Sequence, residues 1–580
     1  YEQHIDIIWG ANAESNLAGY NIYKFDGTRY LLYTVIPKTQ TWFTEWYGSM
    51  GMEASYKVAA FNTLNQESPL SDSVNVRTRP MTDEEFLDMV QRATFRFFWD
   101  YAHPTSGLTR ERLGSGNTVT IGGSGFGVMA LMVGIERNYI TRQQGVERLL
   151  RILTFLTNSA QRFRGAFSHW LNGETGVTIP FSQFDNGGDL VETSLMLQGL
   201  LAARNYFNGT DANEVHIRNL INGIWHGVEW NWYRRATWNP FLIWHWSPNF
   251  GWQMNHRIEG WNEAMICYLL GIASPTHKIP VSSYYEGWAS STNFRNENTY
   301  YGHRLYVGPP FGGPLFFAHY SFLGFDPRNK RDAFANYFVH NRNHTLVNRA
   351  YAIANPRGFT GYGPNTWGLT ASDNPWGYLA HEPFSTDNGT IAPTAALSSM
   401  PYTPRESIDA LKNFYRSFGN RLWGSFGFRD AFNLHQNWFA TSYIAIDQGP
   451  IIIMIENYRT QLLWNNFMAN PEIQAATDSI FVTDTLTTIG NEIEKPLEFN
   501  LSQNYPNPFN PTTRIEFAVP SINKVQGGNE LGNFNVTLEV YDLLGNKIST
   551  LVNEQKFTGR YQRSEERRGG KECRYWWSAV

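Results

Sequence analysis

Six acidic residues lie near the beginning of apolar segments of this sequence, where folding could bring their carboxyl groups together. They are Asp185, Asp189, Glu192, Glu263, Asp387 and Asp447. If the apolar segments are helices that run parallel, their N-termini lie at one end of the fold and the acids converge there. Neighbouring carboxyl groups, one protonated and one ionised, can act as general acid and general base. The candidate catalytic residues are therefore sought in this group.

Each acid also has a structural interpretation. Asp189 with Glu192 has the spacing of a capping box, and Glu263 in a first helical turn is favoured by the helix dipole. Asp387 in "DNG" could be a turn residue, and Asp447, ahead of a Gly-Pro pair, could be an ordinary N-cap. Their recurrence at one predicted end of the fold favours the catalytic interpretation.

Aromatic residues accompany the acids and indicate a substrate class. Phe, Trp and Tyr make up 16% of the 580 residues, against 17% for all charged residues. Sugar rings stack on flat aromatic side chains while their hydroxyl groups bind carboxylates and amides, so this composition points to carbohydrate. The candidate substrate-binding residues are His169, Trp170, Trp252, Trp261, Trp288, Tyr362, Trp367, Trp376, Asp387, Arg357 and Arg429.

Aromatic side chains also have a simpler use, because they more often fill protein cores than contact ligands. We expect a core role in the segment "ATFRFFWDYA" (93–102). A loop tryptophan such as Trp367 in "NTWGLT" is a better binding candidate, because loops carry function.

Composition and motifs argue against several other functions. The chain has 47 basic and 51 acidic residues, a net charge of −4, which offers no basic field for nucleic acid. It has no H-E-x-x-H or similar metal-ligand spacing, no G-x-S-x-G elbow and no P-loop lysine. Its two cysteines, Cys267 and Cys573, do not suffice for a Cys-based zinc site. No apolar run approaches the roughly 18 to 20 residues that cross a bilayer. We expect a monomer with no metal, no other cofactor and no transmembrane segment.

The central part of the chain supplies helical patterns of two kinds. Six segments are apolar on nearly every side, as buried helices are; they are 122–135, 187–203, 260–273, 312–325, 388–400 and 447–458. Six segments that alternate with them carry a one-sided apolar stripe; they are 83–102, 141–163, 213–230, the weaker 281–291, 329–344 and 403–419. Six inner helices alternating with six outer ones predict an (α/α)6 barrel over residues 81–470, in preference to an irregular all-α domain.

The two ends of the chain have β patterns, so the predicted fold class is mainly α with small all-β domains at both ends. Residues 1–80 alternate apolar and polar residues between turn signals, which predicts a β-sandwich. Their strand order resembles a fibronectin type III module without its first strand, and such modules are usually spacers. Residues 471–497 are polar and Thr-rich, which suggests a linker.

Residues 498–562 resemble the C-terminal sorting domain of the type IX secretion system, through the signature "YPNPFNPTT" and two later strand patterns. The resemblance implies recognition by that secretion machinery and delivery to the outside or the outer surface of a Gram-negative bacterium. A signal peptide would lie upstream of Tyr1. The last segment, 563–580, is strongly basic and resembles a translated sequencing adapter, so we treat it as a non-native tail; the alternative is a basic anchor.

Several motifs in order resemble the glucoamylase-like domain of glycoside hydrolase family 144. They include "FDNGGDLVETSLMLQGLLAAR", "WNEAMICYLLGIAS", "WGLTASDNPWGY", "NGTIAPTAALSSMPYTP" and "AIDQGPIIIMIENYRTQLLW". The resemblance implies an (α/α)6 barrel, an inverting mechanism and linear β-1,2-glucan as substrate. It also implies that the family's acidic residues fall on Asp185, Asp189, Glu192, Glu263 and Asp447.

We assign Glu263 as the general acid, because apolar neighbours should raise its pKa, and Asp447 as the base. Glu192 or Asp185 could hold either role, and proton transfer could run through water or a substrate hydroxyl. Endo-cleavage is the first expectation. Exo-release of sophorose, transglycosylation and a non-catalytic glycan-binding protein remain the alternatives.

Overall fold

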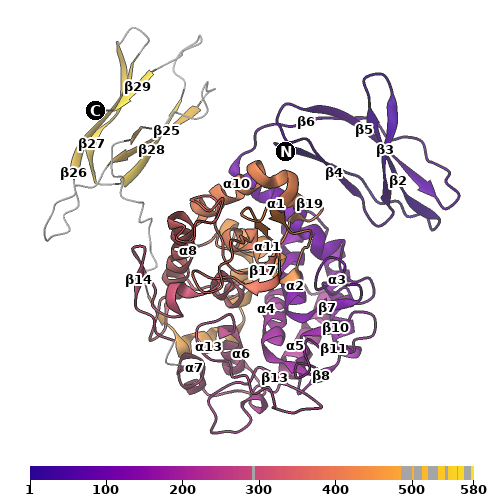
Figure 1. Cartoon of the computed structure of the whole chain (residues 1–580), viewed down its shortest axis with the longest axis vertical. Coiled ribbons are helices and arrows are strands. Elements are labelled where there is room, and N and C mark those ends of the chain that lie inside the picture. The colour runs from indigo at the N-terminus through magenta and orange to yellow at the C-terminus, as the bar shows by residue number, and fades with distance from the viewer. Residues whose placement is uncertain are drawn as a thin grey trace. The chain divides into compact units, whose positions relative to one another are not determined.

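A computed structural model describes residues 1–290, 294–484, 500–501, 512–519, 533–541, 546–557, 559–566 and 576–579. The chain forms two compact units, Tyr1–Asp484 and Thr485–Val580. In the first unit a helical body carries a separate group of strands at its N-terminal end (Figure 1). The predicted class, mainly helical with separate small β regions, is confirmed. In the part of the chain that the structure describes, no helix is long and apolar enough to span a membrane.

The N-terminal strands form two antiparallel sheets. One pairs β1 (His4–Ile8) with β4 (Trp42–Trp46). The other has the order β3 (Tyr30–Pro37), β2 (Leu17–Phe25), β5 (Glu53–Asn62), β6 (Val74–Arg77). Alternate residues of both sheets, among them Ile5, Ile22 and Tyr56, meet in a small core. The fibronectin type III assignment stays a prediction.

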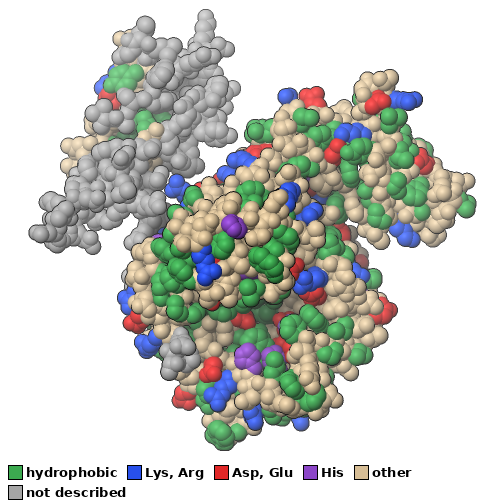
Figure 2. Space-filling model, in the orientation of Figure 1, with side chains coloured by type: hydrophobic (Ala, Val, Ile, Leu, Met, Phe, Trp, Pro, Cys, Tyr) green, Lys and Arg blue, Asp and Glu red, His purple; other side chains and the backbone are tan. Residues whose placement is uncertain are grey.

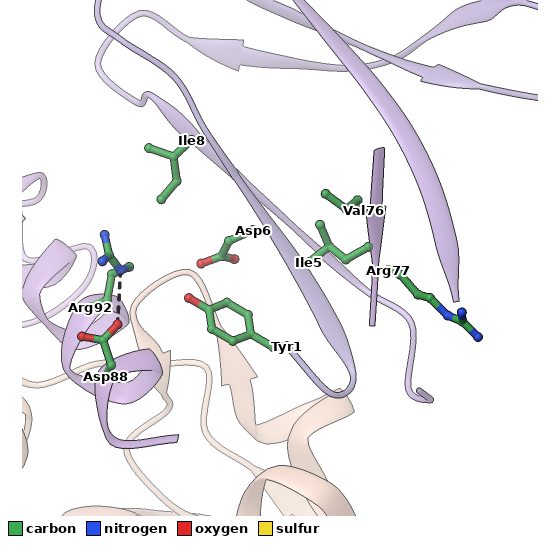
Figure 3. A pocket seen from close by; sticks show the side chains of 8 residues that line it. All are labelled: Tyr1, Ile5, Asp6, Ile8, Val76, Arg77, Asp88 and Arg92. Atoms are coloured by element: carbon green, nitrogen blue, oxygen red, sulfur yellow. Dashed lines mark ion pairs between the residues drawn. The ribbon is translucent and has the colours of Figure 1, made fainter. Parts of the chain in front are cut away.

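Polar contacts fix this β module to the helical body. The Asp6 carboxylate pairs with Arg96 at 2.8 Å, and the Trp42 indole donates to Asp100 at 2.9 Å. A pocket of about 430 Å³ lies at this junction, between β1, β6 and the first helix of the body, and includes the Asp88–Arg92 ion pair of 3.8 Å (Figure 3). No candidate site residue lines the pocket, so we assign it to the domain junction and not to catalysis.

The helical body contains the following helices. They are α1 (Asp83–Trp99), α2 (Ile121–Glu136), α3 (Arg142–Asn158), α4 (Leu190–Tyr206), α5 (Ala212–His226), α6 (Met265–Ala273), α7 (Ser282–Glu286), α8 (Tyr337–Ala354), α9 (Pro393–Leu397), α10 (Pro404–Leu422), α11 (Ala445–Arg459), α12 (Leu462–Met468) and α13 (Pro471–Ile480). Short 3-10 helices are η1 (Trp232–Arg234), η2 (Trp288–Ser290), η3 (Pro310–Gly312), η4 (Leu315–Ala318) and η5 (Tyr320–Phe322).

Short strands connect these helices. They are β7 (Thr118–Thr120), β8 (Arg162–Phe163), β9 (Ala166–Phe167), β10 (Trp170–Asn172), β11 (Thr178–Ile179), β12 (Gly188–Asp189), β13 (His245–Trp246), β14 (Thr299–Tyr300), β15 (His303–Arg304), β16 (Lys330–Arg331), β17 (Ala371–Asn374), β18 (Gly377–Ala380), β19 (Trp423–Gly424), β20 (Gly427–Phe428), β21 (Phe432–Asn433), β22 (Trp438–Phe439) and β23 (Val482–Thr483).

The apolar segments form the buried helices α2, α4, α6, α9 and α11, and the striped segments form helices that cover them. Two expectations were wrong in detail. The segment 312–325 forms the short helices η4 and η5, because its many aromatic residues have low helix propensity and its glycines allow turns. The expected linker begins too early, because α13 (Pro471–Ile480) buries Ile473 against the body.

The C-terminal unit has two small sheets, with strand orders β24 (Asn500–Leu501), β25 (Thr512–Val519), β28 (Gly559–Glu566) and β27 (Lys547–Phe557), β26 (Asn533–Tyr541), β29 (Trp576–Ala579). Ile515 and Phe517 of one sheet share a core with Val536 and Leu538 of the other. The signature "YPNPFNPTT" (505–513) lies outside the described residues except for its last two. The sorting-domain assignment and the foreign origin of 563–580 stay predictions.

Helices α2 and α4 approach closely because glycines face each other. A Cβ atom on Gly125 would lie 2.3 Å from the Leu195 carbonyl oxygen, and one on Gly199 would lie 2.2 Å from the Gly125 carbonyl oxygen. We expect Gly125→Ala to lower the free energy of unfolding by about 1–3 kcal/mol through overpacking, measured by urea denaturation. Gly223→Ala on α5 is the control, because no atom lies within 4 Å there; it should stabilise by about 0.5–1 kcal/mol. Equal effects of the two variants would contradict the account.

Candidate active site

The acids come from the starts of three buried helices. Asp189 is the N-cap of α4 and Glu192 lies in its first turn, while Asp447 lies in the first turn of α11 and Glu263 stands two residues before α6. Burial raises the pKa of the Tyr320 phenol, and the charges of Asp447, Glu263 and Glu192 raise it further, so all three acids lie within electrostatic reach of one side chain. Figure 2 shows this face hollowed between β17 and β13, with acidic side chains in the hollow and histidines at its edge.

Two histidines and two aspartates form a compact group beside Glu192. His169 Nδ1 lies 3.2 Å from Asp189 Oδ2 and 3.5 Å from Asp185 Oδ2. His245 Nε2 approaches the same two oxygens at 3.5 and 3.4 Å. The Asp189 side chain also accepts hydrogen bonds from the N–H groups of Val191 and Glu192, which caps α4. The capping interpretation of Asp189 is therefore correct, and it coexists with a place in the site.

Glu192 does not complete the capping box, because its side chain reaches the neighbouring helix instead. Its Oε2 atom accepts a hydrogen bond of 2.7 Å from the Gly122 N–H in the first turn of α2. A Cβ atom on Gly122 would lie 2.7 Å from that same oxygen. The absence of a side chain at Gly122 thus makes room for the carboxyl group.

The electrostatics of this group favour charge on His169 and Asp189. Burial opposes the imidazolium of His169, yet Glu192, Asp185 and Asp189 together raise its pKa well above the usual value. Burial likewise disfavours ionised Asp189, but hydrogen bonds from His169 and His245 hold its pKa below the ordinary range. Burial raises the pKa of Glu192, against the opposing effect of His169. Asp189 is therefore a fixed anion, which suits positioning better than proton transfer.

His169, Asp185 and Asp189 also offer ligand atoms within 4.8 Å of one another, close enough to hold a metal ion. No sequence motif marks this group, because its members are irregularly spaced along the chain. An imidazolium ligates no metal, so binding would require His169 to lose its proton first. The raised pKa of His169 favours an imidazolium, whose positive charge faces the carboxylates of Asp185 and Asp189.

Glu263 has the environment of a general acid. Burial raises the pKa of its carboxyl group to about 7, and the charges of Glu192 and Asp189 act in the same direction. The Ser321 hydroxyl donates to the Glu263 carbonyl oxygen, which fixes the turn before α6. A carboxyl group that stays protonated near neutral pH can donate a proton to a leaving group.

Asp447 is buried in a second acidic group that the sequence did not predict. Its N-cap interpretation is wrong, because Ile444 occupies that position. Burial and the neighbouring Asp430 raise the pKa of Asp447 well above the usual value. Asp430 in turn accepts a hydrogen bond from the Asp373 N–H at 2.7 Å, and Asp373 pairs with Arg112 at 3.2 Å. No sequence signal marked Asp430, because it lies in a short loop between β20 and β21 and not at a helix start.

The predicted aromatic residues divide into three groups by burial. Trp288 and Trp367 are fully buried and Trp261 nearly so, packed on Tyr337; these belong to the core, and the expectation of an open loop position for Trp367 was wrong. Trp170 and Trp252 are half-buried, and Trp170 contacts the ring of His169. Trp376 is 65% exposed at the tip of the β17–β18 hairpin.

The remaining predicted binding residues form hydrogen bonds that connect loops. Asp387 is buried and accepts hydrogen bonds from Tyr362 at 2.6 Å and from Tyr351 at 2.8 Å. Arg357 donates to the Asp387 carbonyl oxygen at 2.8 Å. Arg429 donates to the Ala440 carbonyl oxygen at 3.4 Å. The turn interpretation of Asp387 is supported by its hydrogen bond from the Gly389 N–H.

The sequence is similar to known glycan-acting proteins. The Glycoamylase family model, which describes glucoamylases, matches residues 255–471. A Parabacteroides distasonis protein named exo beta-1,2-glucooligosaccharide sophorohydrolase (non-reducing end) is 47% identical over 501 residues, which cover 83% of this chain and 69% of the relative.

The chain is also similar to solved structures of proteins named as β-1,2-glucanases. A β-1,2-glucanase from Parabacteroides distasonis matches with a TM-score of 0.76 and 47% identity over 83% of this chain and 71% of that one. An endo-β-1,2-glucanase from Chitinophaga pinensis, in complex with sophorotriose and glucose, matches with a TM-score of 0.67 and 49% identity over 70% of this chain and 99% of that one.

Proposed function

The chain belongs to the glucoamylase-like glycoside hydrolases of family 144, and we propose that it hydrolyses linear β-1,2-glucan within the chain, with inversion of anomeric configuration. The observation that carries the proposal is that two carboxyl groups at the starts of buried helices, Glu263 before α6 and Asp447 in α11, both have a raised pKa and both raise the pKa of the Tyr320 phenol. An inverting glycosidase needs one protonated carboxyl group at the leaving oxygen and one carboxylate at the attacking water.

We propose an (α/α)6 barrel as the architecture that presents this pair. The buried helices contact one another in the order α9, α11, α2, α4, α6, η5, which is the sequence of neighbours that an inner ring requires. The outer helices α1, α3 and α10 each contact this inner set.

In the proposed reaction Glu263 donates its proton to the glycosidic oxygen. Asp447 accepts a proton from the water that attacks the anomeric carbon from the opposite face. The anionic Asp189, held by His169 and His245, orients the sugar between them. The proton taken up by Asp447 returns to Glu263 through solvent before the next turnover.

Exo-release of sophorose is the second candidate, because the relative named as exo-acting matches 83% of this chain while the endo-acting relative matches 70%. The test is incubation of the purified protein with linear β-1,2-glucan and analysis of product length over time. Endo-cleavage gives mixed oligosaccharides and a rapid fall in mean chain length, whereas exo-cleavage gives sophorose alone from the start. If the protein binds the glucan and releases no reducing ends, the enzymatic proposal is wrong.

Trp376 offers a test of where the glucan lies. Its hairpin also carries Asp373, next to Asp430, and Tyr378, a neighbour of Asp447. We expect Trp376→Ala to raise KM by about 2- to 13-fold, the equivalent of ~0.5–1.5 kcal/mol of aromatic contact, with a smaller effect on kcat. Tyr458→Ala is the control, because this exposed aromatic residue lies at the far end of α11 from Asp447. An equal KM change in both variants would remove Trp376 from the binding surface.

We also propose export by the type IX secretion system, on the strength of the sequence signature at 505–513. Expression in a bacterium with that system should deliver the protein outside the outer membrane, and removal of residues 498–580 should leave it in the periplasm. Delivery of the truncated protein to the outside would refute the proposal.

A further inference from the structure

Three bulky aromatic residues have backbone angles that such residues rarely adopt. Tyr301, Phe311 and Phe384 have φ angles of 52°, 62° and 64°, in the left-handed region. Among the described non-glycine residues with a positive φ, six are asparagines, and these three are the aromatic ones. Asparagine tolerates this region, whereas a large side chain there costs free energy. Such strain persists where neighbouring structure enforces it, and it is concentrated at functional sites.

The three residues belong to one cluster, although they come from separate parts of the chain. The ring centre of Phe311 lies 4.7 Å from that of Phe384, 4.3 Å from that of Tyr300 and 6.2 Å from that of Tyr301. We call these four residues the aromatic platform. Tyr301 is 42% exposed and Phe384 is 38% exposed. Burial in the core therefore does not explain why strained positions carry aromatic rings.

Hydrogen bonds fix the loop that carries Phe311. The Asn296 amide donates to the Pro309 carbonyl oxygen at 2.7 Å, before Phe311. His344 Nε2 donates to the Gly313 carbonyl oxygen at 2.9 Å, after Phe311. The loop is held on both sides, so its neighbours enforce the strained backbone.

The backbone of Phe384 is fixed as well. The Ser385 N–H donates to the Pro383 carbonyl oxygen at 2.9 Å, so Phe384 is the centre of a γ-turn with positive φ, which is the rare and strained form. Arg357 donates to the Phe384 carbonyl oxygen at 2.5 Å and to the Asp387 carbonyl oxygen at 2.8 Å. A ring held in this way loses little conformational freedom when it binds a ligand.

Aromatic side chains connect the platform with the candidate active site. A Cβ atom on Gly313, in the loop of Phe311, would lie 3.0 Å from the ring of Phe317. The ring centre of Phe316 lies 4.8 Å from that of Phe317 and 5.2 Å from that of Tyr320, whose phenol the charges of the candidate acids reach. Phe316 and Phe317 are half-buried. Because sugar rings stack on flat aromatic side chains, a glucan that extends from the site has a continuous apolar path to the platform.

Resting on the proposed function, we propose that the aromatic platform is an outlying subsite that stacks a glucosyl unit of the β-1,2-glucan, beyond the units held at the catalytic acids. Four side chains are too few for a protein partner, whose interface takes about 20–30 residues a side, but they suffice for one sugar ring. The platform therefore favours long glucan chains over short oligosaccharides.

The experiment compares Phe311→Leu with the wild type on long β-1,2-glucan and on the shortest oligosaccharide that the protein cleaves. Leucine keeps an apolar side chain but has no flat ring. KM should rise about 2- to 13-fold on the long glucan and stay unchanged on the short substrate, with kcat unchanged on both. Phe311→Tyr keeps the ring and should match the wild type. Phe25→Leu, at an exposed aromatic position on β2, is the matched control and should change neither KM. Equal KM changes on both substrates, or no change on either, would overturn the proposal.

The strained backbone gives a second measurement, which does not need activity. Asparagine tolerates the left-handed region, so Phe311→Asn should keep or raise the melting temperature while it weakens the binding of long glucan. A lower melting temperature would mean that the ring stabilises the fold, against the proposal.

Binding of long glucan is measured by calorimetry in the Glu263→Gln background, where turnover is slow. Adding Phe311→Leu to this background should raise Kd by the same 2- to 13-fold, about 0.5–1.5 kcal/mol. Weaker binding by this double variant, together with a wild type that cleaves no glucan, refutes only the proposed function. Equal binding, together with an active wild type, refutes only the outlying subsite.

Discussion

Replacing Glu263 with glutamine should reduce kcat on β-1,2-glucan by a factor of about 10² to 10⁴, the usual contribution of a general acid. Glutamine has nearly the same shape, but it has no acidic proton to give to the leaving oxygen. Because burial raises the pKa of Glu263 to about 7, the wild type should lose activity as the pH rises above that value. The variant should have no such basic limb.

The leaving group separates the role of Glu263 from a general loss of structure. An aryl glycoside of a β-1,2-glucooligosaccharide releases a phenolate that needs little protonation, so Glu263→Gln should recover much of its rate on this substrate. The helical circular dichroism should match the wild type. Glu286→Gln, on the exposed side of α7, should be fully active on both substrates. Near-normal cleavage of the glucan by Glu263→Gln would remove the assigned role.

The sequence correctly predicted that several of the candidate acids lie at helix starts, because helix starts are local signals. Asp189, Glu192 and Asp447 lie in or beside first turns, as the boundary between polar entry and apolar run indicated. Asp430 and Arg112 were not predicted, because their relation to Asp447 depends on loops. Arg112 meets Asp373, which lies 261 residues further along the chain. A pattern of neighbouring residues in the sequence does not predict a contact between residues so far apart.

For the aromatic residues, the sequence did not predict which side chains are exposed. Trp367 and Trp376 stand nine residues apart in similarly Gly- and Asn-rich sequence, yet one is fully buried and the other 65% exposed. The polarity of the neighbouring residues predicts a loop, but it does not predict which side chains of the loop are buried in the core. Residue type therefore indicated carbohydrate as substrate, while the choice of stacking residues required the fold.

Replacing Asp447 with asparagine should reduce kcat by a similar factor, about 10² to 10⁴, for a different reason. The amide does not accept a proton from the attacking water, so an aryl leaving group should not restore the rate. The backbone position should hold, because the Thr394 hydroxyl donates to the Asp447 carbonyl oxygen at 2.7 Å and Ile444 starts the helix. Asp409→Asn, at an exposed position on α10, serves as the matched control and should be fully active.

The pattern across the two variants assigns the roles. Rescue by the aryl substrate in Glu263→Gln and its absence in Asp447→Asn supports Glu263 as acid and Asp447 as base. The reverse pattern would exchange them, which the raised pKa of both groups permits on electrostatic grounds. A fall of less than tenfold in Asp447→Asn would instead place the base elsewhere in the site, with Glu192 and Asp185 the next acids to substitute.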